Sequence, residues 1–217
     1  MPILSGPVLE PQDSSKPSKL VIFCHGYGAD GNDLIGLANY IQPQMPDAVF
    51  LSPNAPENCG LNPMGYQWFD FQSGDPATIW KGVLNAADTL NGFIDEQLKN
   101  YELSDDNLAL VGFSQGTMMS LHVGLRRENS MRAIVGFSGR LIAPELLKNE
   151  LKSKPPIYLI HGDMDPMVPY QETIEAEKKL LQLSLDVKAH ISPNTQHSIA
   201  QDGLDIAIKF LVEKFSN

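Results

Sequence analysis

Short apolar runs alternate along the chain with longer segments whose apolar residues recur at helical spacing. The apolar runs predict strands at 20–24, 49–52, 108–113, 133–137, 157–161 and 187–191. The longer segments predict helices at roughly 33–41, 77–99, 115–128, 144–151, 171–183 and 200–215. Residues 1–19 fit a leader strand and a polar turn. This alternation predicts an α/β fold, with a mostly parallel twisted sheet covered by helices on both faces.

The segment 53–75 does not follow this rhythm. It is rich in proline and glycine and encloses an apolar cluster formed by Met64, Tyr66, Trp68, Phe69 and Phe71. A long connection inside a compact domain is usually a lid or a binding loop. The alternative is an aromatic plug that completes the hydrophobic core.

Composition and charge narrow the classes of protein. The 217 residues, 42% of them hydrophobic, suffice for one domain spanning 1–217. The chain shows neither a membrane-spanning apolar run nor a secretion signal, so we expect no integral membrane segment. Cys24 and Cys59 fit free thiols, which together with the missing signal predicts a cytoplasmic protein. The net charge of −10, with scattered Lys and Arg, argues against a nucleic-acid partner.

The sequence Gly-Phe-Ser-Gln-Gly at 112–116 lies between a predicted strand and a predicted helix. A sharp turn between them needs small residues two before and two after the serine, so that the backbones approach closely while the hydroxyl projects. Ser114 would then lie at the positive end of a helix dipole, which stabilises negative charge that develops beside it. The alternative is a tight turn with the serine as a helix cap. Ser114 is therefore the candidate nucleophile.

A serine hydroxyl needs an adjacent base, and the base needs an acid to orient it. The predicted strand 157–161 leads into Gly-Asp-Met-Asp-Pro-Met-Val-Pro, a loop at the carboxyl edge of the sheet. Either Asp163 or Asp165 could be the acid. We favour Asp165, because it lies farther from the strand and Pro166 and Pro169 stiffen its loop, whereas Asp163 fits a turn-forming residue.

Five histidines compete for the role of base. His25 and His161 each end a strand before a glycine and are expected to anchor loops, His122 lies on the helix after the serine, and His190 lies inside the last strand. His197 instead occupies the loop between the last strand and the last helix. That position returns it to the carboxyl edge in the chain order Ser, Asp, His, so His197 is the candidate base.

A glycine-rich loop follows the first strong strand, and its Gly26-x-Gly28-x-x-Gly31 matches the spacing of a dinucleotide-binding motif. The context contradicts that interpretation, because the next strand ends Leu-Ser-Pro-Asn at 51–54, without an acid to hold a ribose. Such a loop can instead present a backbone N–H beside the nucleophile. We expect the N–H groups of Tyr27 and Gln115 to form an oxyanion hole, each contributing about 3–4 kcal/mol.

Four segments carry a family resemblance: 21–33, 67–70 (Gln-Trp-Phe-Asp), 112–116 and 161–169. Together they resemble the carboxylesterase/phospholipase family of α/β-hydrolases, which includes the acyl-protein thioesterases. The likeness covers nearly the whole chain, in order and at matching spacings. Two sites depart from the family pattern, since Thr117 replaces a common glycine and Thr195-Gln196 stand where a glycine often precedes the histidine.

The resemblance implies the α/β-hydrolase fold and a catalytic triad made of the motif serine, the last aspartate of His-Gly-Asp-x-Asp and a late histidine. These correspond to Ser114, Asp165 and His197. It also implies that the N–H groups of Tyr27 and Gln115 are the oxyanion donors. Because many members form homodimers, a homodimer is compatible with the resemblance.

We therefore expect a serine carboxylesterase that works through an acyl-enzyme on Ser114, without a metal or organic cofactor. Family members hydrolyse esters, lysophospholipids or the thioesters of palmitoylated cysteines, so the expected partner is an ester or thioester with an apolar acyl chain. Met64, Trp68 and Phe69 would contact that chain. The alternatives are an acyl-protein thioesterase as the main activity, a serine peptidase of the same fold, and a hydrolase-like binding protein without activity.

Overall fold

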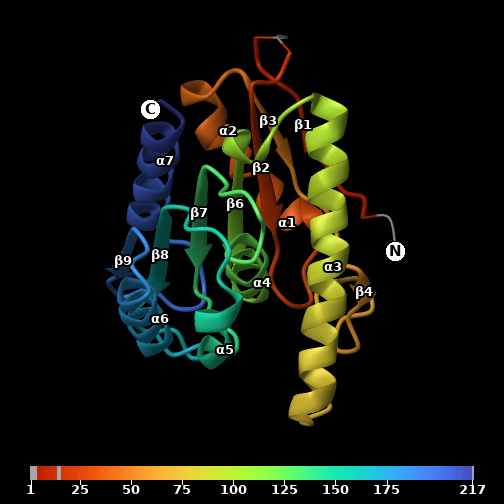
Figure 1. Cartoon of the computed structure of the whole chain (residues 1–217), viewed down its shortest axis with the longest axis vertical. Coiled ribbons are helices and arrows are strands. Elements are labelled where there is room, and N and C mark those ends of the chain that lie inside the picture. The colour runs from red at the N-terminus through yellow and green to blue at the C-terminus, as the bar shows by residue number, and fades with distance from the viewer. Residues whose placement is uncertain (1–3, 14–15, 217) are drawn as a thin grey trace.

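A seven-stranded sheet forms the centre of the computed structural model, which describes residues 4–13 and 16–216 (Figure 1). The strand order is β1-β3-β2-β6-β7-β8-β9, and only β1 runs antiparallel to its neighbour. The strands are β1 (Val8–Leu9), β2 (Lys19–Cys24), β3 (Ala48–Leu51), β6 (Leu108–Phe113), β7 (Ala133–Phe137), β8 (Ile157–Gly162) and β9 (Val187–Ser192). The predicted, mostly parallel sheet is confirmed.

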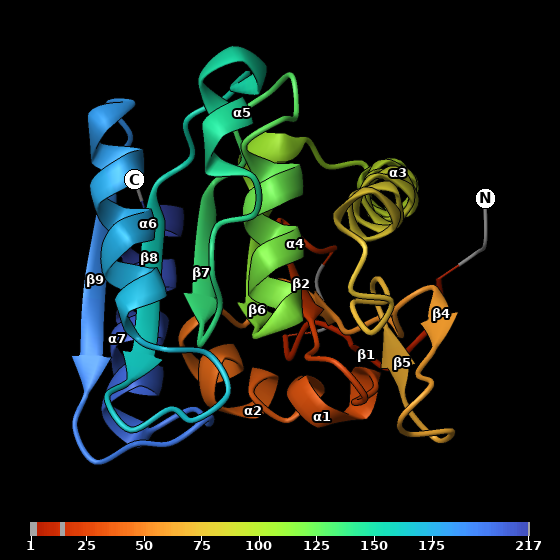
Figure 2. The same cartoon turned by 90° about the horizontal axis from the view of Figure 1, so that it is seen from below.

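Helices cover both faces of the sheet, and Figure 2 shows the two layers. One face packs against α3 (Pro76–Tyr101), α4 (Gln115–Gly124), α5 (Pro144–Glu150) and α6 (Gln171–Gln182). The other packs against α1 (Gly31–Ile35), α2 (Ala38–Ile41) and α7 (Gln201–Ser216). Two 3₁₀ turns, η1 (Gln42–Gln44) and η2 (Asp105–Asn107), complete the helical elements of the described residues. No helix in this part of the chain is both long and apolar enough to cross a membrane.

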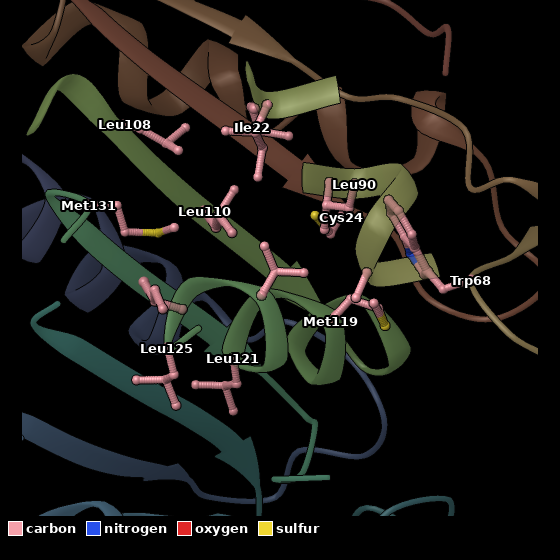
Figure 3. Close-up of a cluster of buried hydrophobic side chains, with 14 of the residues drawn as sticks. Ile22, Cys24, Trp68, Leu90, Leu108, Leu110, Met119, Leu121, Leu125 and Met131 are labelled. Atoms are coloured by element: carbon pink, nitrogen blue, oxygen red, sulfur yellow. The ribbon is translucent and has the colours of Figure 1, made fainter. Parts of the chain in front are cut away.

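Each central strand supplies side chains to two hydrophobic cores. In β2, Leu20, Ile22 and Cys24 belong to one core, and Val21 and Phe23 belong to the other. Figure 3 shows the first core, where strand residues meet the α4 side chains. Successive side chains of a strand point to opposite faces, so a strand covered on both sides is apolar throughout. This is why the central strands were detectable as continuous apolar runs.

The element boundaries differ most from the prediction in two helices. The helix expected at 33–41 is broken into α1 and α2, and it begins earlier because the Asp30 side chain caps it by accepting a hydrogen bond from the Asn32 N–H. The helix expected at 115–128 ends at Gly124, and glycine is a weak helix former. Residues 1–3 and 14–15 of the expected leader strand and turn lie outside the described residues.

The segment 53–75 contains a small two-stranded sheet that the sequence did not reveal. Its strands are β4 (Glu57–Asn58) and β5 (Tyr66–Gln67), which pair antiparallel. Because the central strands are parallel, this segment and the loops after β2, β6, β7, β8 and β9 all leave the same edge of the main sheet. The candidate catalytic residues lie on these loops.

Candidate active site

Ser114 occupies a strained turn between β6 and α4. Its backbone angles are φ 53° and ψ −114°, outside the regions that side-chain-bearing residues usually adopt. The Ser114 N–H donates to the Phe137 carbonyl of β7 at 2.8 Å, which fixes the turn to the sheet. Positive φ at a serine between a strand and a helix is the geometry of a nucleophile elbow.

The two glycines around Ser114 allow the turn to pack against its neighbours. A Cβ added at Gly116 would lie 1.7 Å from the Cys24 carbonyl oxygen of β2. A Cβ added at Gly112 would lie 2.4 Å from the Thr117 backbone nitrogen. Both contacts are with backbone atoms, which cannot move aside as a flexible side chain can. The spacing of small residues in the motif is therefore a steric requirement of this turn.

Thr117, which departs from the family pattern, fits because two glycines surround it. Its hydroxyl donates to the Phe137 carbonyl at 2.7 Å. A Cβ added at Gly136 would lie 2.5 Å from Thr117 Cγ2, and a Cβ added at Gly139 would lie 2.4 Å from Thr117 Cβ. The threonine thus fills space that glycines on β7 and on the loop after it leave open.

The candidate base and acid are in direct contact. His197 Nδ1 lies 2.6 Å from Asp165 Oδ2. The other carboxylate oxygen, Oδ1, accepts hydrogen bonds from the N–H groups of Met167 at 2.8 Å and Val168 at 2.9 Å. Burial tends to raise the pKa of the Asp165 carboxyl, but the hydrogen bonds from His197 and from the two backbone N–H groups outweigh it and hold the pKa below its usual value. Asp165 is therefore ionised at neutral pH.

Asp163 serves the structure of the neighbouring loop. Its side chain is exposed and accepts a hydrogen bond from the Thr195 N–H at 3.3 Å. The Thr195 carbonyl in turn accepts from the Met164 N–H at 2.9 Å. A Cβ at Gly162 would lie 2.2 Å from the same carbonyl oxygen, so the two loops touch here. This contact holds the loop of Asp165 against the loop of His197.

His197 lies beside the serine turn. Its ring centroid is 4.9 Å from that of Phe113, the residue before Ser114, with the planes tilted by 50°. The His197 side chain keeps 21% of its surface exposed, whereas the Asp165 side chain is fully buried. His197 thus contacts Asp165 directly and contacts the serine turn through Phe113.

The candidate oxyanion loop contacts the serine turn through Gly26. A Cβ added there would lie 3.1 Å from Phe113 Cδ1 and 3.5 Å from Ser114 Cβ. Tyr27 follows directly, and Gly28 takes a positive φ of 77°, which glycine adopts without strain. The N–H of Gly28 donates to the Tyr66 carbonyl at 2.8 Å, and the Tyr66 N–H donates to the Ala29 carbonyl at 2.7 Å. The segment 53–75 therefore fixes the loop that carries the Tyr27 N–H.

The Gln115 side chain ties the same segment to the serine turn. Its Oε1 accepts from the Trp68 backbone N–H at 2.8 Å, and its Nε2 donates to the Phe69 carbonyl at 2.7 Å. Both hydrogen bonds are buried. The Trp68 indole N–H donates to the His25 carbonyl at 3.0 Å. Gln115 thus has a structural side chain in addition to the backbone N–H that the sequence singled out.

The three residues expected to contact an acyl chain occupy different environments. Trp68 is fully buried and Phe69 nearly so, and Figure 3 shows Trp68 in the core cluster near Cys24 and Met119. Their positions match the aromatic plug that was the alternative interpretation. Met64, in contrast, is 84% exposed.

Other exposed apolar side chains lie on the loops of this edge, and the sequence prediction did not assign them a role. They are Leu61, Phe71, Met164 and Met167. Phe71 also packs against Tyr27, with ring centroids 4.4 Å apart. Met164 and Met167, which flank Asp165, could have indicated this surface in the sequence. Large apolar residues on a loop often mark a binding surface.

Two further polar groups near the site, Cys24 and His25, lie in structural surroundings. Both cysteines are free, and burial raises the pKa of the Cys24 thiol to about 12, so it is not a thiolate at neutral pH. His25 anchors its loop as expected, with Nδ1 2.7 Å from the Gly26 carbonyl and Nε2 accepting from the Ala55 N–H at 2.9 Å. Within residues 4–13 and 16–216, no three His, Cys, Asp or Glu side chains group closely enough to hold a metal ion.

Known proteins are similar to this chain over almost its full length. A family model described as Phospholipase/Carboxylesterase matches residues 8–214. Acyl-protein thioesterase 1 of Saccharomyces cerevisiae is 29% identical over 91% of this chain and 93% of its own length. Esterase YpfH of Escherichia coli is 27% identical over 92% of this chain and 85% of its own length. The crystal structure of esterase PE8 superposes with a TM-score of 0.93 and 44% identity, covering 97% of this chain and 99% of that chain.

Proposed function

The chain belongs to the phospholipase/carboxylesterase family and is a serine esterase of the α/β-hydrolase fold, and we propose that Ser114, His197 and Asp165 perform its reaction. The observation that carries the proposal is the 2.6 Å contact between His197 Nδ1 and the buried Asp165 carboxylate. An ionised carboxylate only accepts hydrogen bonds, so it keeps the proton of His197 on Nδ1. The Nε2 lone pair is then free to act as a base.

In the first half of the reaction, Ser114 Oγ attacks the carbonyl carbon of the ester while its proton passes to His197 Nε2. The carbonyl oxygen becomes an oxyanion in the tetrahedral intermediate. When the C–O bond to the leaving group breaks, His197 returns the proton to the departing alcohol. The product of this half is an acyl-enzyme on Ser114.

In the second half, water attacks the acyl carbon and gives its proton to His197 Nε2. Collapse of the second tetrahedral intermediate releases the carboxylic acid, and the proton returns to Ser114 Oγ. In both halves the N–H groups of Tyr27 and Gln115 donate to the oxyanion, and the amino end of α4 adds its dipole. No step requires a group beyond the side chains and backbone of this chain and a water molecule.

For the substrate, we propose an ester with an apolar acyl chain. The exposed apolar side chains on the loops of the catalytic edge support this, because they can cover acyl-chain methylenes that would otherwise face water. The exposure of Met64 supports a role for this residue in contacting the acyl chain. A thioester of an acylated protein cysteine is the second candidate, favoured by the activity named for the yeast relative. Both substrates would form the same acyl-enzyme.

We also propose that the enzyme works in the cytoplasm and has no nucleic-acid partner. The two unlinked cysteines and the net charge of −10 support these proposals. A homodimer is proposed from the family resemblance alone. Light scattering on the purified protein measures its mass directly, and a monomer at micromolar concentration would remove that proposal.

The test of the proposed reaction is a chain-length series of p-nitrophenyl esters beside a long-chain acyl-thioester peptide. Ser114→Ala should reduce kcat on every substrate by about 10⁴- to 10⁶-fold. Ser216→Ala, which changes an exposed serine on α7, serves as the control. A fluorophosphonate should label Ser114 in the wild type and leave the variant unlabelled by mass spectrometry. A Ser114→Ala protein with wild-type rates would refute the proposal.

A further inference from the structure

His161 lies near the carboxyl end of β8, and its side chain is fully buried between α6 and the loop that carries Asp165. Its Nε2 is 3.1 Å from Asp165 Oδ2 and 2.9 Å from the Val168 carbonyl oxygen. Its Nδ1 is 2.7 Å from the hydroxyl of Thr173, a residue of α6 that is itself buried. His161 thus touches the same carboxylate oxygen that contacts the candidate base.

The neighbours of His161 determine which ring nitrogen carries the proton. Both groups beside Nε2 are acceptors, so a proton must lie on Nε2. Burial lowers the pKa of His161 despite the opposing hydrogen bond to Val168 and the charge of Asp165, so the ring is neutral at pH 7. The Nδ1 of a neutral ring with an Nε2 proton has a lone pair. It therefore accepts the hydroxyl proton of Thr173.

We propose that His161 and Thr173 are positioning residues of this esterase, which orient Asp165 and through it His197. The proposal rests on the triad of the proposed function. The Thr173 hydroxyl donates to His161 Nδ1, and the single Nε2–H of His161 is shared between Asp165 Oδ2 and the Val168 carbonyl. His197 Nδ1 donates to the same carboxylate oxygen. The chain of hydrogen bonds connects a helix on one face of the sheet to the catalytic base.

The hydrogen bonds of Asp165 explain why this arrangement restricts movement. A carboxylate offers about four lone-pair positions. Oδ1 receives the N–H groups of Met167 and Val168, and Oδ2 receives His161 and His197. Rotation of the carboxylate would break bonds at both oxygens at once. Without His161, Oδ2 keeps only the hydrogen bond from His197, which must also serve as the base, while the two backbone bonds at Oδ1 remain.

Two other histidines show that this arrangement is specific. His25, at the equivalent end of β2, has the opposite proton position, with Nδ1 facing the Gly26 carbonyl and Nε2 accepting from the Ala55 N–H. It makes no hydrogen bond to a triad residue. His190 also pairs with an aspartate, Asp202 at 2.7 Å, but both side chains are partly exposed. His190 therefore provides a matched control for a histidine–aspartate pair outside the site.

The first test compares His161→Leu with His161→Gln. Leucine keeps a similar volume and removes every hydrogen bond, whereas glutamine retains a donor toward Asp165 and an acceptor toward Thr173. We expect His161→Leu to lower kcat by about 10- to 100-fold, because a loosened Asp165 misplaces His197. KM should stay near the wild-type value, because the fully buried His161 side chain does not contact the substrate. His161→Gln should recover most of the lost kcat, and His190→Gln should match the wild type.

The second test uses the other end of the chain of hydrogen bonds. Thr173→Val removes the hydroxyl and keeps the shape, and Thr173→Ser restores the hydroxyl. We expect a severalfold lower kcat for the valine variant and recovery by serine. Thr89→Val is the control, because Thr89 is a buried helix threonine whose hydroxyl donates only to the Asn85 carbonyl of its own helix, at 2.9 Å. It should leave kcat unchanged.

Two further readouts separate positioning from simple loss of packing. The short His197–Asp165 hydrogen bond should give a downfield proton resonance, and the acid limb of the kcat/KM pH profile reports protonation of the free enzyme's base. Removing the His161 donor leaves more negative charge on Oδ2, which favours the protonated base. In His161→Leu the acid limb should therefore move to higher pH and the resonance should shift. A residue that only fills space would change neither.

The proposal is overturned if His161→Leu keeps the wild-type kcat, acid limb and resonance, or if the leucine and glutamine variants behave alike. If circular dichroism shows that His161→Leu is unfolded, the Thr173→Val and Thr173→Ser pair decides, and equal kcat values for these two variants would refute it. Ser114→Ala separates this result from the proposed function. An inactive Ser114→Ala beside unaffected His161 and Thr173 variants refutes the positioning role alone, whereas an active Ser114→Ala refutes the triad itself.

Discussion

At the scale of single residues, the Asp165 carboxylate connects the fold to the chemistry. It is fully buried and accepts from two backbone N–H groups and two imidazoles. Burial tends to raise its pKa, but the hydrogen bonds from His197, Val168 and Met167 outweigh that effect and keep it ionised. The loop of residues 163–169 wraps around this one side chain. The same hydrogen bonds that shape the loop therefore fix the carboxylate that we propose as the acid of the triad.

Asp165→Asn should consequently reduce kcat far more than KM. An asparagine amide can donate toward His197 Nδ1, which would move the imidazole proton to Nε2 and block the base. The expected loss is about 10⁴-fold in kcat, the size that this change causes in triads of the same logic. Asp163→Asn is the matched control, since Asp163 is exposed and makes a single 3.3 Å bond to the Thr195 N–H. Equal losses from the two variants would contradict the assignment of Asp165.

The residues of the proposed triad could be selected from the sequence because residue type and chain order leave few options. Only one serine lies between two suitably spaced glycines after a strand, and His197 is the one histidine in a loop at the correct end of the chain. The roles of His161 and Thr173 could not be predicted in detail. They depend on contact between β8 and α6, which no local spacing encodes. The burial of Trp68 likewise depends on where a long irregular segment packs.

At the scale of elements, the serine turn is built by contact between β2, β6 and α4. Gly116→Ala should abolish folding or reduce the free energy of unfolding severely, because the new Cβ would lie 1.7 Å from the Cys24 carbonyl oxygen. Gly36→Ala is the control. Gly36 has helical angles, and no atom lies within 4 Å of its added Cβ, so the change should be neutral or slightly stabilising. Chemical denaturation of both variants decides, and a Gly116→Ala protein of wild-type stability would exclude this close approach.

The Gln115 side chain attaches the segment 53–75 to the serine turn through two buried hydrogen bonds. Gln115→Ala leaves the Trp68 N–H and the Phe69 carbonyl without their partner in a buried place, at a cost of about 1–3 kcal/mol for each group. Activity should fall as well, because the same segment fixes the loop of the Tyr27 N–H. Gln42→Ala, which removes one exposed hydrogen bond to the Glu10 carbonyl, should change neither stability nor activity. A stable, fully active Gln115→Ala protein would show that this attachment is dispensable.

Regular elements were predictable where burial imposes a period, and less so where the chain is irregular. The central strands appear as apolar runs because both faces are covered, and family membership confirms the esterase inferred from them and from the motifs. The sequence predicts too late an end for α4, because nothing in Arg126-Arg127 opposes a helix. β4 and β5 were missed because two-residue strands carry no detectable alternation.

At the scale of the whole molecule, burial of histidines links the fold to pH. Burial lowers the pKa of His25, His122 and His161, and that of His122 falls from 6.5 to about 4. A histidine whose pKa is lower in the folded state stays neutral there and takes up a proton on unfolding. Its contribution to stability is complete above the unfolded pKa of about 6.5 and is lost as pH falls toward the folded value. Asp165, whose pKa is also lowered, acts only at more acidic pH, near and below its unfolded value of 3.8.

His122 should therefore dominate the loss of stability in mild acid. Within the described part of the chain its Nδ1 has no hydrogen-bond partner, its side chain is buried, and its ring meets that of Trp80 edge-on at 5.6 Å. This one residue should reduce the free energy of unfolding by about 2 kcal/mol between pH 7 and pH 5. His122→Phe keeps an aromatic ring against Trp80 and removes the titrating group, so this variant should lose about 2 kcal/mol less over the same interval. Chemical denaturation at both pH values measures the difference, and His190→Gln, which changes a partly exposed histidine, is the control. An unchanged pH dependence in His122→Phe would mean that His122 accepts its proton without opening the fold.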